Sequence, residues 1–345
     1  MRVLVFEYIT GGGLLPAKSA GPTSDAFSSR RLDHDLLAEG RAMVTALASD
    51  FATLAGCDVH VLRDADVDLL LPPTVRTHAV RDTAEYAEAF DEQAAAADWT
   101  VVIAPECDGA LLACAERVLG SGGRLLSPGP DIILLSSDKQ ATAEHLARSG
   151  VAVPRGAVVA PDHSVPAGLA FPLVIKPRDG AGSQGVRLVR SAADYAAAVR
   201  EQASARVEEY CPGEAASVAI LCGPRGNAPL APCRQRLSDD GRLAYLGGST
   251  PIPQNLAERA TALANRAVAT LEGAVGYLGV DLVLGPEESG AGDRVIEINP
   301  RLTTSYVGLR AAYDSNLAGA MLEIAAGLIP PLNWNRTFDS TRVEW

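Results

Sequence analysis

The sequence predicts a mixed α/β and α+β protein of 345 residues, in which a doubly wound N-terminal unit precedes a strand-rich remainder. Three observations support this prediction. Over roughly the first 130 residues, short apolar runs alternate with helical patterns, which is typical of βαβ units around a parallel sheet. From Ser136 the pattern changes to closely spaced strands. Near the C-terminus, Glu297 and Asn299 place polar groups in a strand that should be apolar.

The N-terminal unit is predicted to begin with a strand and to end near residue 128. Its turn Gly11-Gly12-Gly13 lacks GxGxxG, and a loop of about twenty residues follows, so a dinucleotide site is not expected. The elements predicted here are the strand Arg2 to Ile9, the helix Arg30 to Ala55, the strand Asp58 to Leu62, the helix Thr83 to Ala97, the strand Trp99 to Ala104, the helix Gly109 to Leu119 and the strand Arg124 to Ser127.

The remainder is predicted to open with a helix that Ser136, Ser137 or Asp138 would cap. Strands and single helices then follow one another without an internal repeat. The predicted elements are the helix Ser136 to about Ser149, the strands Ala157 to Val159, Leu173 to Lys176 and Val186 to Val189, the helix Ala192 to Gln202, the strands Arg206 to Tyr210 and Ala216 to Cys222, the helix Gln254 to Leu271, and the strands Tyr277 to Leu284 and Arg294 to Ile296.

Composition argues against several classes of partner. The formal net charge is −12, so nucleic acid and anionic membrane are poor main partners. No run approaches the roughly 20 apolar residues of a membrane span, and Glu7 interrupts what would be the core of a signal peptide. A soluble, cytoplasmic protein is therefore expected. The six cysteines show no metal-ligand spacing and are expected to be reduced thiols.

Two acids and an amide are predicted to meet on one face of a hairpin. Glu297 and Asn299 are two residues apart on a strand, so their side chains point to the same face. A hairpin folded near Ser289 would set Asp281 opposite Glu297. Carboxylate and amide oxygens suit a hard cation such as Mg²⁺, which would also relieve the repulsion between the acids. A half-exposed hairpin with solvated acids is the alternative.

A glycine-rich loop after a buried strand is predicted to bind phosphate. Lys176 lies near the end of an apolar strand, and the glycines that follow leave backbone N–H groups free to turn toward an anion. The loop residues predicted to take part are Gly180, Gly182, Ser183 and Gly185. Lys139, at a helix start, is a second candidate for the phosphates, although exposed lysines are common in first turns.

The stretch Arg206 to Tyr210 has the form of a hinge strand whose backbone could meet a purine. The predicted contacts are Glu208, Glu209 and Tyr210, with Glu214 on a ribose hydroxyl. An edge strand with solvated acids explains these residues equally well. P-loop and protein-kinase motifs do not occur in the sequence, which disfavours those two classes of enzyme.

Two acids follow strands of the N-terminal unit at their carboxyl ends, where open α/β sheets bind ligands. Glu7 ends the first strand and Glu106 follows Ala104-Pro105. Together they are predicted to receive an amine or ammonium group. Capping of a following turn or helix is an equally strong alternative.

The order of these features resembles the ATP-grasp superfamily over roughly residues 128 to 310. The resemblance implies an ATP-grasp fold with an N-terminal pre-ATP-grasp domain over 1–128, a central subdomain with the glycine-rich loop over 129–205, and a C-terminal subdomain with the metal-binding hairpin over 206–345. It implies ATP between the two subdomains, with Lys139 and Lys176 on the phosphates. It further implies Mg²⁺, or Mn²⁺ in its place, on Asp281, Glu297 and Asn299. Arg301 and Lys176 would then act in catalysis by stabilising charge on the transferred phosphoryl group.

A narrower likeness involves both ends of the chain. The segments Phe6 to Gly13, Ile103 to Glu106 and Asn299 to Ser305 look like the ATP-grasp ligases of methanofuran biosynthesis, which join the γ-carboxylate of glutamate to the amine of tyramine. The two lysines and the metal-type hairpin make an ADP-forming carboxylate–amine ligase that works through an acyl phosphate the leading hypothesis. For the substrates, we predict Glu7 and Glu106 at the amine and Thr303, Thr304 and Ser305 near the acid.

Other functions stay open at this point. A sibling ligase with another acid or amine fits the same motifs, as does a phosphotransferase or carboxylase on the same scaffold. A nucleotide-binding regulator without chemistry is a third class. The expected partners are two small-molecule substrates, with no nucleic acid and no membrane, and a homodimer is left open.

Overall fold

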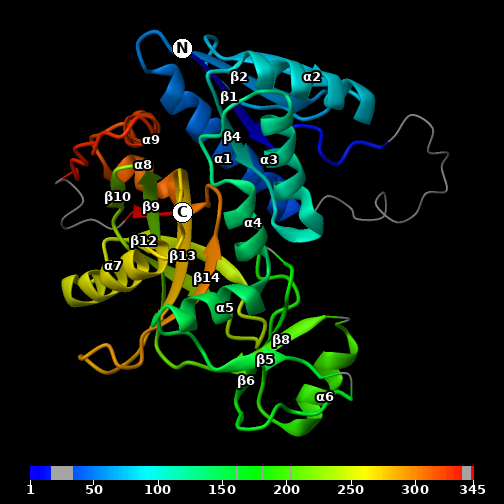
Figure 1. The fold of residues 1–345 in the computed structure, drawn as a ribbon, viewed down its shortest axis with the longest axis vertical. Coiled ribbons are helices and arrows are strands. Elements are labelled where there is room, and N and C mark those ends of the chain that lie inside the picture. The colour runs from blue at the N-terminus through cyan, green and yellow to red at the C-terminus, as the bar shows by residue number, and fades with distance from the viewer. Residues whose placement is uncertain (17–33, 161, 181, 203, 336–342) are drawn as a thin grey trace.

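The computed structural model describes residues 1–16, 34–160, 162–180, 182–202, 204–335 and 343–345. Three sheets lie along the long axis of the molecule, with the N-terminal sheet and the small sheet that carries α6 at opposite ends (Figure 1). The long loop predicted after Gly13 and the predicted start of the first helix at Arg30 fall largely outside the described residues. Within those residues, no helix is both long and apolar enough to cross a membrane.

The N-terminal sheet is parallel, with the strand order β3-β2-β1-β4, which confirms the predicted βαβ unit. Alternate residues of β1 pack on opposite faces: Val5 contacts the core under α1, and Phe6 the core under α2 and α3. The elements are β1 Arg2–Glu7, α1 His34–Ala52, β2 Asp58–Asp64, β3 Arg76–Val80, α2 Thr83–Ala96, β4 Trp99–Ile103, a short 3₁₀ turn Cys107–Gly109 and α3 Ala110–Gly120.

Two predictions for this unit were incomplete. No strand was predicted over β3. In the structure β3 is a solvent-facing edge strand in which only Val80 is buried, so its apolar signal is weak. The strand predicted over Arg124 to Ser127 is reduced to one bridge between Thr100 and Leu125. Both differences arise at sheet edges, where half of the pairing is missing and the apolar signal is weak.

The helix predicted from Ser136 to Ser149 is only partly correct. The structure has two helices, α4 Pro130–Ser137 and α5 Lys139–Arg148, which meet at Asp138. Asp138 has an extended backbone and accepts hydrogen bonds from the N–H groups of Gln140 and Ala141, so it ends one helix and caps the next. This break places Lys139 at the first position of α5.

The small sheet is antiparallel, with the order β5-β8-β6-β7, and α6 covers one face. Leu173, Ile175 and Val207 pack under α6, so Lys176 and Glu208 point to the other face. The elements are β5 Gly156–Val158, β6 Leu173–Pro177, β7 Arg187–Val189, α6 Ala192–Arg200 and β8 Ala205–Glu209. Since β8 pairs with β5 and β6, the strand that contains residue 206 belongs to this sheet. The division of the chain at 205/206 stays a prediction.

The large sheet is antiparallel, with the order β14-β13-β9-β11-β12-β15 and β10 beside β9. On β9, Val218 and Ile220 pack under α7, and Ala219 and Leu221 pack in the core that α9 shares with α1. The elements are β9 Glu214–Gly223, β10 Gly226–Pro229, β11 Cys233–Leu237, β12 Tyr245–Thr250, α7 Gln254–Val268, β13 Gly276–Leu284, β14 Arg294–Asn299, α8 Ser305–Ala312, α9 Leu317–Ala325 and β15 Val343–Glu344.

The N-terminal unit and the large sheet share one apolar core. Phe51 of α1 and Met321 of α9 belong to the same buried cluster, and Asp50 accepts hydrogen bonds from Tyr306 (2.7 Å) and Arg310 (2.9 Å) of α8. Helix α1, which packs on β1, is therefore held against α8. This packing brings Glu7 and Glu106 into the region of Arg301.

Candidate active site

The hairpin of β13 and β14 brings the predicted acids together. Asp281 lies directly opposite Glu297, which confirms the predicted pairing. Ile296 is an extra residue on β14, because Val295 pairs with Leu282 next along the ladder. Such a β-bulge re-aims side chains, and both Ile296 and Glu297 are half-buried. The hairpin therefore presents polar groups on the face opposite α7.

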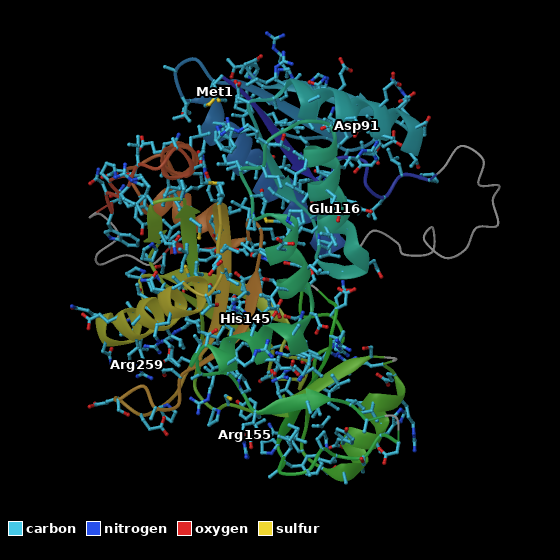
Figure 2. All side chains as sticks on the ribbon, viewed as in Figure 1. Met1, Asp91, Glu116, His145, Arg155 and Arg259 are labelled. Atoms are coloured by element: carbon cyan, nitrogen blue, oxygen red, sulfur yellow. The ribbon has the colours of Figure 1, made fainter. Side chains whose placement is uncertain are left out.

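Helix α7 holds the base of this hairpin. Arg259 donates from Nη2 to the Gly285 carbonyl (2.8 Å) and from Nε to Asp293 (3.0 Å), and Asp293 accepts the Gly285 N–H (2.9 Å). Figure 2 shows Arg259 on α7 beside the extended loop of the hairpin. These contacts fix the register of the two strands at the loop end of the hairpin.

Asp281 has a raised pKa. Its Oδ1 accepts from Gln235 Nε2 (2.9 Å) and its Oδ2 from Asn299 Nδ2 (3.0 Å). Burial, and then the charge of Glu297, raise its pKa to about 7, although the two amide hydrogen bonds and Arg301 act to lower it. A cation bound beside this carboxyl group would stabilise its ionised form.

The residues present fit a hard divalent cation. Asp281, Glu297 and Asn299 offer oxygen atoms from one face, and the two acids repel unless a positive charge lies between them. Among the described residues there is no group of three or more His, Cys, Asp or Glu side chains that could hold a metal ion by itself. Mg²⁺ usually keeps several waters and binds through one or two carboxylates together with substrate phosphates.

Lys139 reaches the acids from α5. Its Nζ lies 3.5 Å from Glu297 Oε2 and donates to the Gly180 carbonyl (2.6 Å). Gly182 (φ +65°) and Gly185 (φ +74°) adopt the left-handed backbone that favours glycine, and Ser183 (φ +59°) shares it. The loop, Lys139 and the hairpin therefore adjoin, as predicted, whereas their role on phosphates stays a prediction.

Lys176 belongs to a buried charge cluster on the inner face of the small sheet. Its Nζ lies 2.6 Å from Glu208 Oε1 and donates to the Ile296 carbonyl of the hairpin (3.3 Å). Glu208 Oε2 accepts from Arg206 Nε (2.8 Å), and Arg206 also donates to Gln140 and to the Pro154 carbonyl (3.0 Å). One carboxylate thus holds two buried cations, and Lys176 links the small sheet to β14.

The remaining hinge residues lie apart from the metal face. Glu209 points away from Glu208 and pairs with Arg155, which Figure 2 places on the small subdomain. Tyr210 is 37% exposed, and both Glu209 and Tyr210 line a pocket of about 460 Å³ that includes Glu287 and Arg294 of the hairpin but none of the three predicted metal ligands. Glu214 pairs with Arg234 of β11. The structure does not bring these three side chains to the acids, and their nucleotide contacts stay predictions.

Arg301, which follows β14 of the large sheet, and Glu106 of the N-terminal unit form an ion pair. Arg301 Nη2 donates to Glu106 Oε2 (3.1 Å), and Nε lies 2.9 Å from Oε1. Both side chains are at least 86% buried, so the pair is shielded from water. The sequence predicted Arg301 on phosphate and Glu106 on an amine, and the tertiary structure adds this direct link between them.

Glu7 is buried at the end of β1. Its carboxylate accepts from the N–H groups of Ile9 (3.1 Å) and Thr10 (2.7 Å), and Gly40 of α1 leaves the space beside it. Burial raises its pKa, against the opposing effect of these hydrogen bonds and of Arg301. The turn-capping alternative is therefore realised for Glu7, whereas Glu106 makes no side-chain cap. An amine role for either acid stays a prediction.

Hydroxyl groups line the chain after Arg301. Thr303 Oγ1 and Ser305 Oγ lie 2.8 Å apart, and Tyr277 OH lies 3.3 Å and 3.0 Å from them. Thr304 precedes α8 and is hydrogen-bonded by Tyr245. The predicted acid-side residues are thus placed at the start of α8 by two buried or half-buried tyrosines.

Sequence reasoning missed two site residues. Gln235 comes from β11, for which the sequence predicted no strand, and its hydrogen bond to Asp281 arises only in the folded sheet. Arg206 was treated only as part of the hinge, although a charged residue inside the run Ala205 to Val207 already indicated a buried partner.

We expect the free energy of unfolding of the metal-free protein to depend on pH through the titration of Asp281. Its pKa is raised in the folded state, so between about pH 4 and pH 7 the unfolded chain has lost a proton that the folded protein keeps. The free energy of unfolding therefore falls as pH rises through this window, and the penalty is complete above about pH 7. Asp281→Asn should remove this pH dependence. In the presence of a metal chelator, the free energy of unfolding of Asp281→Asn relative to that of the parent should therefore increase from about pH 4 to about pH 8.

Denaturant unfolding at several pH values measures this difference. Asp239→Asn, at an exposed position on the turn before β12, is the matched control and should show no such trend. A constant difference between Asp281→Asn and the parent across the window would contradict the buried, charge-opposed state of Asp281.

Two protein-family models match the chain in adjoining ranges. A pre-ATP-grasp domain matches residues 57–133, and an ATP-grasp domain matches residues 136–305. The second range contains both lysines, the glycine-rich loop and the polar hairpin. The first contains β4 and the turn that carries Glu106.

Individual relatives agree with this order of domains. The chain is 32% identical over 119 residues to a tyramine–L-glutamate ligase of Methanocaldococcus fervens, and the match covers 34% of this chain and 37% of that protein. The match thus spans little more than a third of the relative. A putative ATP-grasp superfamily protein from Archaeoglobus fulgidus has the same fold, with a TM-score of 0.69, 22% identity, and coverage of 95% and 90% of the two chains.

A third structure extends the comparison to a nucleotide complex. N5-carboxyaminoimidazole synthetase from Staphylococcus aureus complexed with ADP matches with a TM-score of 0.69 and 15% identity, over 97% of this chain and 79% of that one. At these identities the two structures establish the fold alone. Both domain matches, in this order and around these residues, establish that the chain belongs to the ATP-grasp superfamily.

Proposed function

We propose that this protein is an ATP-dependent carboxylate–amine ligase that forms an amide through an acyl phosphate and releases ADP. The observation that carries the proposal is the convergence of Lys139 and Lys176 on one acidic hairpin, with Arg301 beside it. Cations from two other elements and two closely paired acids suit a triphosphate with a divalent metal. Membership of the ATP-grasp superfamily supports the same conclusion.

The chemistry needs activation before the amide bond forms. A substrate carboxylate oxygen attacks the γ-phosphorus of ATP, the bond to the β,γ-bridging oxygen breaks, and ADP leaves. The amine then attacks the acyl carbon, phosphate departs with the former carboxylate oxygen, and the amine nitrogen loses a proton. Phosphate is a much better leaving group than the oxygen of a free carboxylate, which is why ATP is consumed.

This chain contributes position and charge to these steps. Mg²⁺ on Asp281, Glu297 and Asn299 would neutralise charge on the phosphates. Lys139 and Lys176, now held by Glu297 and Glu208, would exchange part of that pairing for phosphate oxygens. Arg301 is kept charged and oriented by Glu106, so it needs little rearrangement to meet the transferred group.

For the substrates we propose glutamate, reacting through its γ-carboxylate, and tyramine or a similar amine. The name of the methanocaldococcal relative, a tyramine–L-glutamate ligase, supports this pair of substrates. The acid would lie near Thr303, Thr304 and Ser305. Because Glu106 is already paired with Arg301, Glu7 is the stronger candidate for the amine. The partial match to that relative supports the class of reaction more than the identity of either substrate.

A second candidate is carboxylation or phosphoryl transfer on the same scaffold, which the fold shared with N5-carboxyaminoimidazole synthetase favours. The two candidates separate in one experiment. The full chain is incubated with ATP, Mg²⁺ and a matrix of amino acids and amines, with and without bicarbonate, and ADP and product masses are measured. A ligase yields amide in step with ADP for particular acid–amine pairs. ADP release that depends on bicarbonate or gives a stable phosphorylated product would reject the ligase proposal.

We expect Glu7→Gln to impair use of the amine more than binding of ATP. Glutamine keeps the volume of the side chain and one of the two oxygen atoms that accept from the Ile9 and Thr10 N–H groups. It removes the negative charge. The KM for the amine should rise while the KM for ATP changes little. An unchanged amine KM would remove Glu7 from the substrate site. Glu88→Gln, at an exposed position on α2, serves as the control.

A further inference from the structure

The turn between β4 and α3 contacts two parts of the site at once. It runs from Glu106 through the 3₁₀ turn Cys107–Gly109. Asp108 (φ +56°) and Gly109 (φ +69°) both adopt the left-handed backbone. For a residue other than glycine this conformation is uncommon and persists where the surroundings hold it, often at a functional position.

The glycine-rich loop touches this turn. The Asp108 N–H donates to Asp179 Oδ2 (3.0 Å), and Asp179 immediately precedes Gly180 in the loop. The loop also approaches α1, where a Cβ atom on Gly182 would lie 3.7 Å from Leu36 Cδ2. One hydrogen bond, between residues 71 apart in sequence, therefore ties the start of the loop to the N-terminal unit.

The same turn holds Arg301. Glu106 is only 4% exposed and pairs with both Nε and Nη2 of Arg301. Asp108 is two residues further along the turn, so any shift of its backbone is transmitted to Glu106 over a very short segment. The loop and Arg301 consequently have a common support in residues 106–109.

We propose that Asp179 is a positioning residue that fastens the glycine-rich loop over the reaction site, and that the turn 106–109 couples this closure to the placement of Arg301. The coupling to chemistry rests on the proposed ligase function. With the loop fastened, water is kept from the acyl phosphate. With the loop loose, water adds to the intermediate and returns the carboxylate and phosphate, so that ATP is consumed and no amide forms.

Hydrogen exchange tests the fastening without reference to any ligase activity. In the full chain with Mg²⁺ and a non-hydrolysable ATP analogue, Asp179→Ala should speed exchange of the Asp108 amide by about tenfold or more, the size expected when a bond to a charged acceptor is lost. Asp179→Asn retains an acceptor oxygen and should restore most of the protection. Glu201→Ala, at an exposed acid at the end of α6, should leave it unchanged. Equal exchange in Asp179→Ala and the parent would overturn the proposal.

Product ratios test the coupling to chemistry. For an acid–amine pair that the parent joins, Asp179→Ala should raise the ratio of ADP to amide while the KM for the amine stays the same, and Asp179→Asn should bring the ratio back. A lower rate with an unchanged ratio would overturn the coupling and leave Asp179 as a structural contact. If the parent forms no amide with any pair, the ligase proposal fails, whereas the exchange result still decides whether Asp179 fastens the loop.

Discussion

Glu297→Gln is expected to lower amide-forming turnover at least about 100-fold, the loss seen when one preorganised electrostatic contact is removed from an active site. The change deletes a negative charge from the paired acids while it keeps the shape of the side chain. It also removes the partner of Lys139, whose Nζ lies 3.5 Å from Glu297. Turnover as a function of Mg²⁺ concentration measures the effect, which should persist at saturating ATP.

The control for this prediction lies on the same hairpin. Glu288→Gln makes the same chemical change in the exposed turn between β13 and β14 and should leave turnover unchanged. Both variants should unfold at denaturant concentrations close to that of the parent. Turnover near the parental value in Glu297→Gln would reject the metal site on the hairpin.

Glu208→Ala is expected to destabilise the protein by about 3–5 kcal/mol, the cost of leaving buried charges without their partner. Lys176 Nζ and Arg206 Nε lie 2.6 Å and 2.8 Å from the two carboxylate oxygens, and all three side chains are at most 5% exposed. After the substitution, two buried cations face each other with only carbonyl and amide oxygens nearby. Denaturant unfolding followed by a probe in the small sheet measures this loss.

The neighbouring residue provides a matched comparison. Glu209→Ala removes the same carboxylate one position along β8, but this side chain points to solvent and pairs with the exposed Arg155. Surface pairs contribute little, so the loss should be far smaller than for Glu208→Ala. Similar losses in the two variants would show that the buried cluster does not stabilise the small sheet as its geometry implies.

The alternating elements of the N-terminal unit and the β13–β14 hairpin could be predicted because their signals are local. Val3 to Phe6 is apolar on both faces, as a strand between helical layers requires, and the turn composition between β13 and β14 sets the register. Edge strands such as β3 were missed. The helix predicted from Ser136 corresponds to α5, which Asp138, one of the predicted caps, starts at Lys139, whereas α4 was not predicted.

The sequence predicted most residues of the candidate site, but it predicted fewer of the ion pairs and hydrogen bonds between them. Lys139, Lys176, Asp281 and Glu297 converge as expected, because the strand face and the helix start dictate where they point. The Glu106–Arg301 pair joins residues 195 apart in sequence, and no local pattern reports such a contact. Gln235 was invisible for the same reason, since only the packing of β11 near β13 gives it a partner.

The sequence by itself determined which residues carry charge and on which face of each strand they lie, because side-chain direction follows from backbone periodicity alone. It thereby specified an ATP-grasp order of lysines, glycine-rich loop and acidic hairpin. Only the tertiary structure decided which acidic side chain pairs with which basic or polar side chain. Burial removes the screening of water, so the partners of Asp281, Glu208 and Arg301 depend on which distant elements pack together, and that packing is a property of the whole chain.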